Sequence, residues 1–389
     1  MSALFVAISS HRLSFWFSRF ARSFAVIAAI GYDQTFADVI LAGRFEHGVG
    51  HARAAGDVGL LTELAARHGA SLLALGEIGE LAAVLSKLPR EAPHTNPVFA
   101  LALAGAAVEA ADPEGAAYWT EVATGLSDSV PSRYREEFDT GIAVATLYQA
   151  RIAGDPRDAL TAARILIPDR EYPAAYGTDL EALALCNLGA LEMWTGDPEG
   201  AHRYLVRGYE IARVRGRHYL QVYALSHIAI EQTAWSGEIS GARQAATDAL
   251  RICEQFGWRA TPRAGPALTV LSVLALLEGR LDDAARLVDE AVACLVGGLE
   301  LPVRTNAALQ RARVRRAQGA PDEALELVAG VKDDLDGTPF LAPIEGILEM
   351  EYALALWALG RRDEAVERLA RRTVEGPISG EAPVALAGL

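Results

Sequence analysis

The sequence predicts an all-α protein, a right-handed superhelix of stacked helix-turn-helix repeats with a period of about 41 residues. Three observations predict this fold: a glycine followed five residues later by an alanine recurs regularly, the apolar residues between copies keep helical spacing, and no alternating strand pattern of useful length appears. A two-helix unit cannot bury its apolar face alone, so neighbouring units must stack around one extended core. The length of 389 residues therefore does not require separate domains.

Six glycine and alanine pairs mark the repeat junctions, and the positions of successive glycines differ by 42, 41, 42, 40 and 41. The pairs are Gly154 with Ala159, Gly196 with Ala201, Gly237 with Ala242, Gly279 with Ala284, Gly319 with Ala324, and Gly360 with Ala365. An earlier copy, 112–116, has the same five letters as 197–201, and more irregular junctions at Gly43 and Gly76 extend the array upstream. The recurrence favours one repeat array.

The residue types at the junctions explain how one helix ends and the next begins. A glycine can end a helix in the left-handed conformation without steric cost, and a neighbouring aspartate can cap the helix that follows. Pro156, Pro198 and Pro321 come next, at the first helical position, where a missing N–H loses nothing. The alanine five residues after the glycine lets the two helices of a pair approach closely.

Apolar residues at three- and four-residue spacing predict the helices themselves. The clearest examples are Leu180–Trp194, Ala284–Val296 and Leu348–Leu359. Proline-containing stretches are expected to connect one unit to the next, at 168–173, 261–266, 302 and 337–343.

Composition agrees with packed helices and weighs against several classes of protein. Hydrophobic residues make up 51% of the chain but aromatic residues only 7%, so most of the apolar mass is Ala, Leu and Val. The net charge of −14 and the isoelectric point near 5.1 argue against direct nucleic-acid binding. Cys186, Cys253 and Cys294 lie far apart, so we expect buried thiols in a reducing cytoplasm, without disulfides or a zinc site.

The N-terminal segment 1–32 is apolar, and we set it apart from the repeats. Leu13–Ile30 has a membrane-like length, but Arg19 and Arg22 interrupt it, and each would cost roughly 2.5 to 3.5 kcal/mol at mid-bilayer. We expect an amphipathic helix or residues upstream of the fold, and the alternative is a secretion signal with 24–30 as its apolar core. We expect one solenoid over 33–375 and a flexible tail over 376–389.

Parts of the sequence resemble known helical repeats. Cys186–Ala201 resembles the tetratricopeptide (TPR) pattern, with the small Gly189 seven residues before the turn glycine and Ala201 five after it. Upstream, the order of the stretches 51–57, 73–78, 84–89 and 96–101 is similar to the repeat region of MalT-like, LuxR-type ATP-dependent transcription activators. That likeness covers 43–375 and implies a helical scaffold in transcription regulation.

Members of that family carry a nucleotide-binding module before the repeats and a helix-turn-helix after them, and this sequence matches neither. Its two lysines, Lys87 and Lys332, precede Leu88 and Asp333, so a G-x-x-x-x-G-K-[ST] phosphate loop is absent. The residues after Ala365 are too few for a DNA-reading domain. We therefore expect the sensor or scaffold portion of such a regulator, as a truncated reading frame, a fragment or a partner of other chains.

The TPR resemblance implies a ligand site on the concave face, made by the first helix of each unit. Counted from each turn glycine, the inward positions are −13, −10, −6, −3 and −2. This count gives Cys186 and the candidate binding residues Met193, Trp194, His227, Glu231, Trp235, Asn306, Arg313, Arg316, Met350 and Trp357. Aromatic rings with a few polar partners suit a peptide or a small effector, and the alternative is that the tryptophans pack between repeats.

No residue pattern indicates catalysis, a cofactor or a metal. His47 and His51 have the spacing of two ligands on a helix, but no third ligand is nearby. The arginine runs at 203–217, 311–316 and 361–372 are expected to be solvated helix faces, with phosphate binding as the alternative.

Two classes of function follow from the sequence. We favour a non-enzymatic, cytoplasmic TPR-like scaffold or sensor that binds a protein, a peptide or a small effector and does not itself contact nucleic acid or a membrane. The alternative is an enzyme on a helical solenoid, with an active site too dispersed to recognise in the sequence.

Overall fold

The computed structural model describes residues 54–65, 90–109, 112–153, 178–195, 197–296, 301–335 and 342–370, together with Gly50, Ala52, Leu85, Ala163, Leu166 and Ile167. The chain divides into two compact units, Met1–Gly56 and Asp57–Leu389, and the helices labelled below belong to the second. Several predicted features lie outside the described residues: the segments 1–32 and 376–389, the junctions at Gly43, Gly76, Gly154 and Gly196, and the pair His47 and His51.

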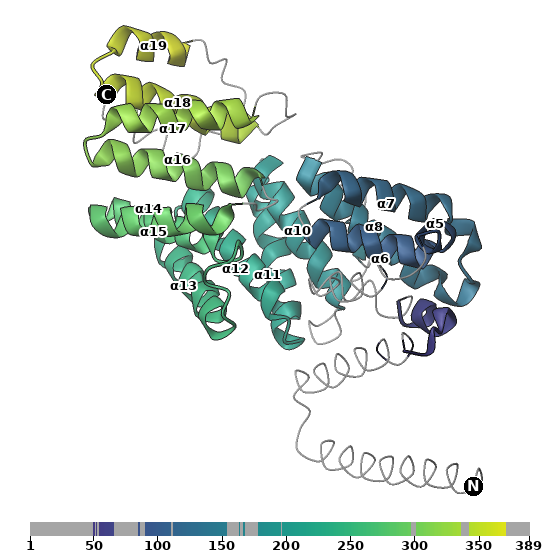
Figure 1. Cartoon of the computed structure of the whole chain (residues 1–389). Coiled ribbons are helices and arrows are strands. Elements are labelled where there is room, and N and C mark those ends of the chain that lie inside the picture. Colours follow the sequence, from purple (N-terminus) through teal and green to yellow (C-terminus); the bar gives the residue numbers. More distant parts are fainter. Residues whose placement is uncertain are drawn as a thin grey trace, which may run out of the picture. The chain divides into compact units, whose positions relative to one another are not determined.

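Every regular element in the described part of the second unit is helical (Figure 1). The helices are α5 (Ala92–Thr95), α6 (Pro97–Glu109), α7 (Pro113–Gly125), α8 (Arg135–Ala153), α10 (Asp179–Thr195), α11 (Pro198–Val214), α12 (His218–Glu231), α13 (Ile239–Gln255), α14 (Gly265–Leu277), α15 (Leu281–Leu295), α16 (Leu301–Ala317), α17 (Pro321–Leu335), α18 (Ala342–Ala358) and α19 (Arg362–Ala370). Two 3-10 turns, Ser127–Ser129 and Ser132–Tyr134, precede α8, and a π-helical turn, η4 (Gln232–Ser236), follows α12.

Each helix from α10 onward packs against the next one in chain order, and Figure 1 labels these helices. The pairs are α10 with α11, α12 with α13, α14 with α15, α16 with α17, and α18 with α19. The first helices of successive pairs also touch: α10 with α12, α12 with α14, α14 with α16, and α16 with α18. Contacts between neighbours in this order define an α-solenoid and confirm the predicted fold class.

The junction chemistry predicted from the sequence is present wherever a junction is described. Left-handed φ values of 71° to 84° occur at Gly237, Gly279, Gly319 and Gly360. After Gly279, the Arg280 N–H donates to the Ala275 carbonyl at 2.9 Å, which closes the end of α14. The alanines five residues after the junction glycines are at most 1% exposed: Ala201, Ala242, Ala284, Ala324 and Ala365. Small residues therefore stand where the helices of a pair approach most closely.

An aspartate cap begins the second helix of a pair, as predicted. The Asp197 carboxylate accepts a hydrogen bond of 2.9 Å from the Gly200 N–H, and Pro198 is the first residue of α11. The same arrangement begins α7 at Asp112, where Gly115 donates at 2.9 Å. These contacts satisfy N–H groups that the first turn of a helix leaves without a partner.

Three prolines expected in the connections between units lie instead in the first turn of the next helix. They are Pro266, Pro302 and Pro343, each the second residue of its helix, α14, α16 or α18. The first turn of a helix does not use its N–H groups, so a proline there costs no hydrogen bond.

The turns between repeats contain a second set of left-handed glycines that the sequence analysis missed. Gly216, between α11 and α12, has a φ of 68°, and Gly257, between α13 and α14, has a φ of 70°. The interval between these two glycines equals the interval from Gly196 to Gly237, so they follow the same period as the junction glycines.

The first helices are buried on more sides than the second helices. All residues from Leu220 to Glu231 of α12 are buried, whereas α13 buries one stripe against the core. The difference arises because a first helix contacts its own partner and the first helices on both sides, while a second helix keeps one face in solvent. Among the described helices, none combines the length and apolarity that crossing a bilayer requires.

Candidate functional site

The predicted residues of α12 lie in a buried polar stripe. Tyr223, His227 and Glu231 follow at four-residue spacing, which puts them on one face of the helix. The His227 ring stacks on the Tyr223 ring with centroids 4.1 Å apart, and its Nδ1 lies 2.9 Å from the Tyr223 carbonyl oxygen. The buried Glu231 carboxylate lies 3.0 Å from Nδ1 of His202 on α11, which is exposed. The stripe thus reaches the surface at His202.

The hydrogen bond that closes the end of α12 spans one residue more than the corresponding bonds at the ends of the other first helices. In η4 the Glu238 N–H donates to the Gln232 carbonyl, six residues back, at 3.0 Å. The corresponding bonds at the next three junctions, such as Arg280 to Ala275, span five residues. The π-helical turn accommodates the extra residue, and Trp235 within it packs, half buried, against the main core cluster. Single π-helical turns are frequent at functional sites.

The predicted arginines of α16 both bind one buried carboxylate on α18. Arg313 Nε lies 2.6 Å from Oε1 of Glu351, and Arg316 Nη2 lies 3.3 Å from its Oε2. The Glu351 side chain is only 4% exposed, so this ion pair connects two neighbouring first helices inside the array. Glu351 lies one residue from the predicted Met350, and only the packing of α16 on α18 identifies it as the partner of the arginines.

The remaining predicted residues divide into buried and half-exposed side chains. Met193 is fully buried in the main core cluster, and Met350 and Cys186 are buried as well. Asn306 and Trp357 are half exposed, and the Arg362 guanidinium lies 5.1 Å from the centroid of the Trp357 ring. The side chain of Trp194 lies outside the described residues. Contact of these residues with a ligand stays a prediction.

Four consecutive repeats place a large, partly exposed side chain close to the junction glycine at the end of the first helix. We call this set the first-helix rim: Trp235, Leu277, Arg316 and Trp357. Leu277 is 62% exposed, which is unusual for a leucine at the end of an otherwise apolar helix. The sequence analysis missed Leu277, although it lies two residues before Gly279 and the same count would have found it. The helices that carry these residues touch in order, so we treat the rim as a candidate surface.

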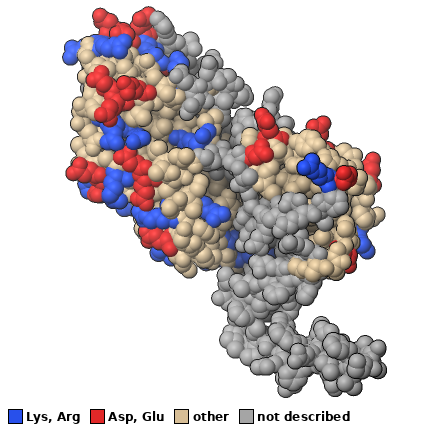
Figure 2. All heavy atoms as spheres, in the orientation of Figure 1, with Lys and Arg blue, Asp and Glu red and all other residues tan. Residues whose placement is uncertain are grey.

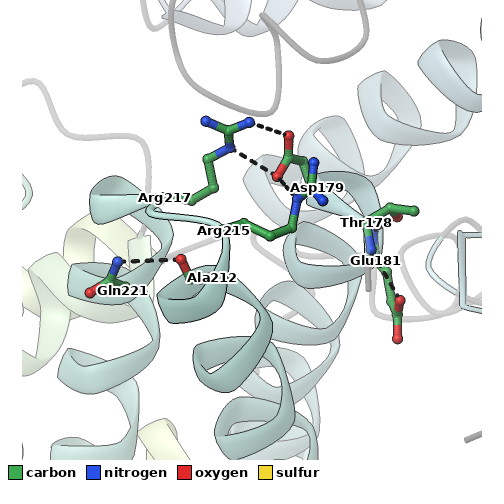
Figure 3. Close-up of polar contacts among 7 residues, drawn as sticks. All are labelled: Thr178, Asp179, Glu181, Ala212, Arg215, Arg217 and Gln221. Carbon is green, nitrogen blue, oxygen red and sulfur yellow. Dashed lines mark hydrogen bonds and ion pairs between the residues drawn. The ribbon is translucent and has the colours of Figure 1, made fainter. Parts of the chain in front are cut away.

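A second buried carboxylate, Asp179 at the start of α10, binds two arginines from the turn before α12 (Figure 3). Arg217 donates to Asp179 through Nε at 2.9 Å and through Nη2 at 2.8 Å, and Arg215 Nε contacts the same carboxylate. Burial raises the pKa of Asp179, but the hydrogen bonds from Arg217 and Arg215 outweigh it and hold the pKa below the ordinary value of 3.8. This contact connects two repeats and was not predicted.

The arginine runs do not converge on one site in the described part of the chain. Within 311–316, Arg311 and Arg315 bind Asp289 of α15. Arg313 and Arg316 instead bind Glu351 of α18, the next first helix along the chain. On the face drawn in Figure 2, acidic and basic side chains alternate instead of forming one charged field. Most of these arginines thus connect helices instead of forming a phosphate site. Among the described residues, no group of three or more His, Cys, Asp or Glu side chains is placed to hold a metal ion.

The fold is similar to that of solved helical repeat proteins. A Rap protein complexed with Competence and Sporulation Factor matches with a TM-score of 0.56 and 12% identity, over 80% of this chain and 96% of that one. Aspartyl phosphate phosphatase F from Bacillus subtilis matches at 0.46 and 14% identity, over 75% and 73% of the two chains. The P58(IPK) TPR domain matches at 0.26 and 13% identity, over 85% and 89%. No protein-family model and no curated protein matches the sequence. The helix pairing and the likeness to the Rap protein identify the fold as a TPR-like α-solenoid.

Proposed function

We propose that the chain is a non-enzymatic scaffold or sensor that binds a protein or peptide partner on the first-helix rim. The observation that carries this proposal is the exposed Leu277, together with the partly exposed Trp235, Arg316 and Trp357, one large side chain near the end of the first helix in each of four neighbouring repeats. Apolar and aromatic side chains beside a guanidinium suit a peptide that has both apolar and acidic groups. The Rap protein of similar fold was solved with Competence and Sporulation Factor, which agrees with ligand binding by this architecture.

We further propose that the binding serves transcription regulation, as part of a MalT-like, LuxR-type system. The support for this is the resemblance of residues 43–375 to the repeat region of those activators. In this role the chain would bind an effector or a partner chain that carries the ATPase and the DNA-binding domain. Its acidic net charge of −14 is consistent with a part of the system that does not touch DNA.

Site-specific photo-crosslinking in the native cell tests the binding surface. A benzophenone amino acid replaces Leu277 on the rim or Arg286 on α15, a matched control whose side chain is 61% exposed. We expect a discrete crosslinked partner from position 277 and none from 286. We also expect L277A to abolish capture of that partner while the melting temperature of the full chain stays unchanged, because the side chain is mostly in solvent.

Two results would contradict these proposals separately. Equal crosslinking from 277 and 286, or capture that L277A leaves unchanged, would overturn the rim as the binding surface. A specific partner that has no ATPase, DNA-binding domain or other link to gene expression would overturn the regulatory role and leave the binding surface in place. Replacement of Trp235 by alanine separates packing from binding, because a core role predicts a large fall in melting temperature.

A further inference from the structure

A cluster of stacked planar side chains lies where two successive inter-repeat turns meet. We call it the ring cluster: His218, Tyr219, Phe256, Trp258 and Arg263. The His218 and Phe256 rings have centroids 4.4 Å apart, and the Phe256 and Trp258 rings stack at 5.0 Å. The Arg263 guanidinium lies 4.6 Å from the centroid of the Trp258 ring and 4.9 Å from that of Tyr219. His218 and Tyr219 are chain neighbours, so the contacts form a closed circuit.

Among the described residues Arg263 binds no carboxylate, unlike Arg215, Arg217 and Arg259 at the same turns. Arg259 pairs with Glu290 at 2.7 Å and also contacts Glu254, and Arg217 pairs with Asp179. Among the described residues, the Arg263 guanidinium contacts the two rings and has no hydrogen bond or ion pair. Ring stacking fixes the plane of a guanidinium and leaves the N–H groups at its edge available to a carboxylate.

The ring cluster also presents apolar surface to solvent. The Phe256 side chain is 39% exposed, and the other four members are partly exposed. Burial lowers the pKa of His218, so its imidazole is neutral at pH 7 and contributes a ring face instead of a charge. A ligand therefore meets apolar ring faces beside one positive group.

The local charge indicates the chemistry of that ligand. The two turns carry four arginines, and three carboxylates among the described residues bind all of them but Arg263. The arginines are Arg215, Arg217, Arg259 and Arg263, and the carboxylates are Asp179, Glu254 and Glu290. The turns thus have a positive excess on a chain whose net charge is −14. A long polyanion such as nucleic acid would meet the repulsion of the whole chain, whereas a short acidic segment would meet mainly the local excess.

We propose that the ring cluster binds a short acidic peptide segment of a partner protein, with a carboxylate on the Arg263 guanidinium and a neighbouring aromatic side chain against Phe256. A carboxylate fits the forked N–H groups of arginine in a bidentate contact, and an aromatic ring stacks on the exposed face of Phe256. His218 and Tyr219 begin α12, whereas Trp235 of the first-helix rim follows its other end. The site is therefore additional to the rim, and its test does not depend on the rim binding anything.

Fluorescence anisotropy with the full chain tests the proposal. The probe is a fluorescein-labelled peptide, Glu-Glu-Phe-Glu-Glu, compared with Gln-Gln-Phe-Gln-Gln, and a labelled single-stranded oligonucleotide serves as polyanion control. We expect saturable binding of the acidic peptide only. We expect R263Q to weaken that binding by about tenfold or more, because it removes the charge and the forked donors. The matched control is R251Q on α13, whose arginine is 65% exposed, and we expect it to change binding less than about twofold.

A second variant keeps the test decisive if R263Q fails to fold. R263K retains the charge without the planar fork, and we expect it to fold and to weaken binding by about threefold or more. The proposal is overturned by any of three results: no saturable binding of the acidic peptide to the wild-type chain, equal weakening by R263Q or R263K and by R251Q, or binding of the oligonucleotide as tight as that of the acidic peptide.

Discussion

At the scale of single residues, two buried carboxylates connect repeats through paired arginines. Asp179 binds Arg215 and Arg217, and Glu351 binds Arg313 and Arg316. In both cases the carboxylate lies on a first helix. The partners of Asp179 come from the turn before the next first helix, and those of Glu351 come from the neighbouring first helix. Removing one member of a buried pair leaves the other charges without compensation, so each carboxylate is expected to matter for stability.

Replacement of Glu351 by glutamine tests this role. We expect E351Q to lower the free energy of unfolding by about 3 kcal/mol, because Arg313 and Arg316 keep their charge inside the array. The matched control is E364Q, since Glu364 pairs with Arg361 at the surface, and its urea midpoint should stay unchanged. Similar midpoint shifts for the two variants would show that the Glu351 contact does not stabilise the array.

Stability should depend on pH through Asp179. Its pKa is lower in the folded chain than the ordinary value of 3.8, so its stabilising contribution is complete above that value and is lost as the pH falls toward the folded pKa. We expect D179N to cost about 3 kcal/mol at pH 7 and less at pH 3, where the Asp179 carboxylate of the unfolded chain takes up protons that the folded chain resists. Urea titrations of both proteins at pH 7, 5 and 3 measure the difference, and a constant difference would contradict this account.

At the scale of helices, glycines inside helices set how closely α10 and α11 pack. A Cβ at Gly189 of α10 would lie 2.6 Å from Leu205 Cγ and 2.9 Å from the Ala201 carbonyl oxygen. A Cβ at Gly208 of α11 would lie 2.7 Å from the sulfur of Cys186. The close approach expected from Ala201 therefore depends equally on glycines that the two helices direct at each other.

Alanine substitutions at two helical glycines should have opposite signs. G189A should destabilise the chain by about 1 to 3 kcal/mol, because the new methyl group overpacks against Leu205. G330A on α17 should stabilise it by about 0.5 to 1 kcal/mol, because alanine has the higher helix propensity and nothing lies within 4 Å of the new Cβ. Chemical denaturation measures both, and changes of the same sign would refute the contact argument.

At the scale of the whole molecule, each helix is stabilised mainly by its neighbours in the array. Successive pairs touch through their first helices, and the main core cluster runs from Met193 on α10 to Cys294 on α15. An array of this kind tolerates the loss of terminal repeats better than a cut through a helix, because most of its interactions join neighbouring helices. The exception among the described helices is the contact of α10 with α18.

Truncation at a repeat boundary tests this locality. A chain that ends at Val296, after α15, should keep its helical content per residue in circular dichroism, with a smaller urea m-value. A chain that ends at Ser272, inside α14, loses Leu274 and Ala291 from the core cluster and should have a lower helical content per residue. Equal loss of structure in the two chains would show that the second unit is stabilised cooperatively as a whole.

The sequence by itself determined where helices end and begin, because the chemistry of a junction is local. Gly279 with Arg280, and Asp197 with Pro198, fix their turns through contacts within six residues, and such patterns recur visibly along a chain. It also placed His227, Glu231 and Arg316 on first helices. The sequence did not reveal which of these side chains would reach solvent.

Exposure and pairing were decided by the tertiary structure alone. Stacking of the first helices buried Met193 and His227 but left Leu277 exposed, because burial depends on helices that are distant in sequence. Asp179 binds Arg217, which lies 38 residues further along the chain. Arg263, in the turn before α14, lies over the ring of Tyr219, which begins α12 after the preceding inter-repeat turn. No local pattern encodes these contacts, since they arise only when one repeat packs on the next and brings its turns and helix ends together.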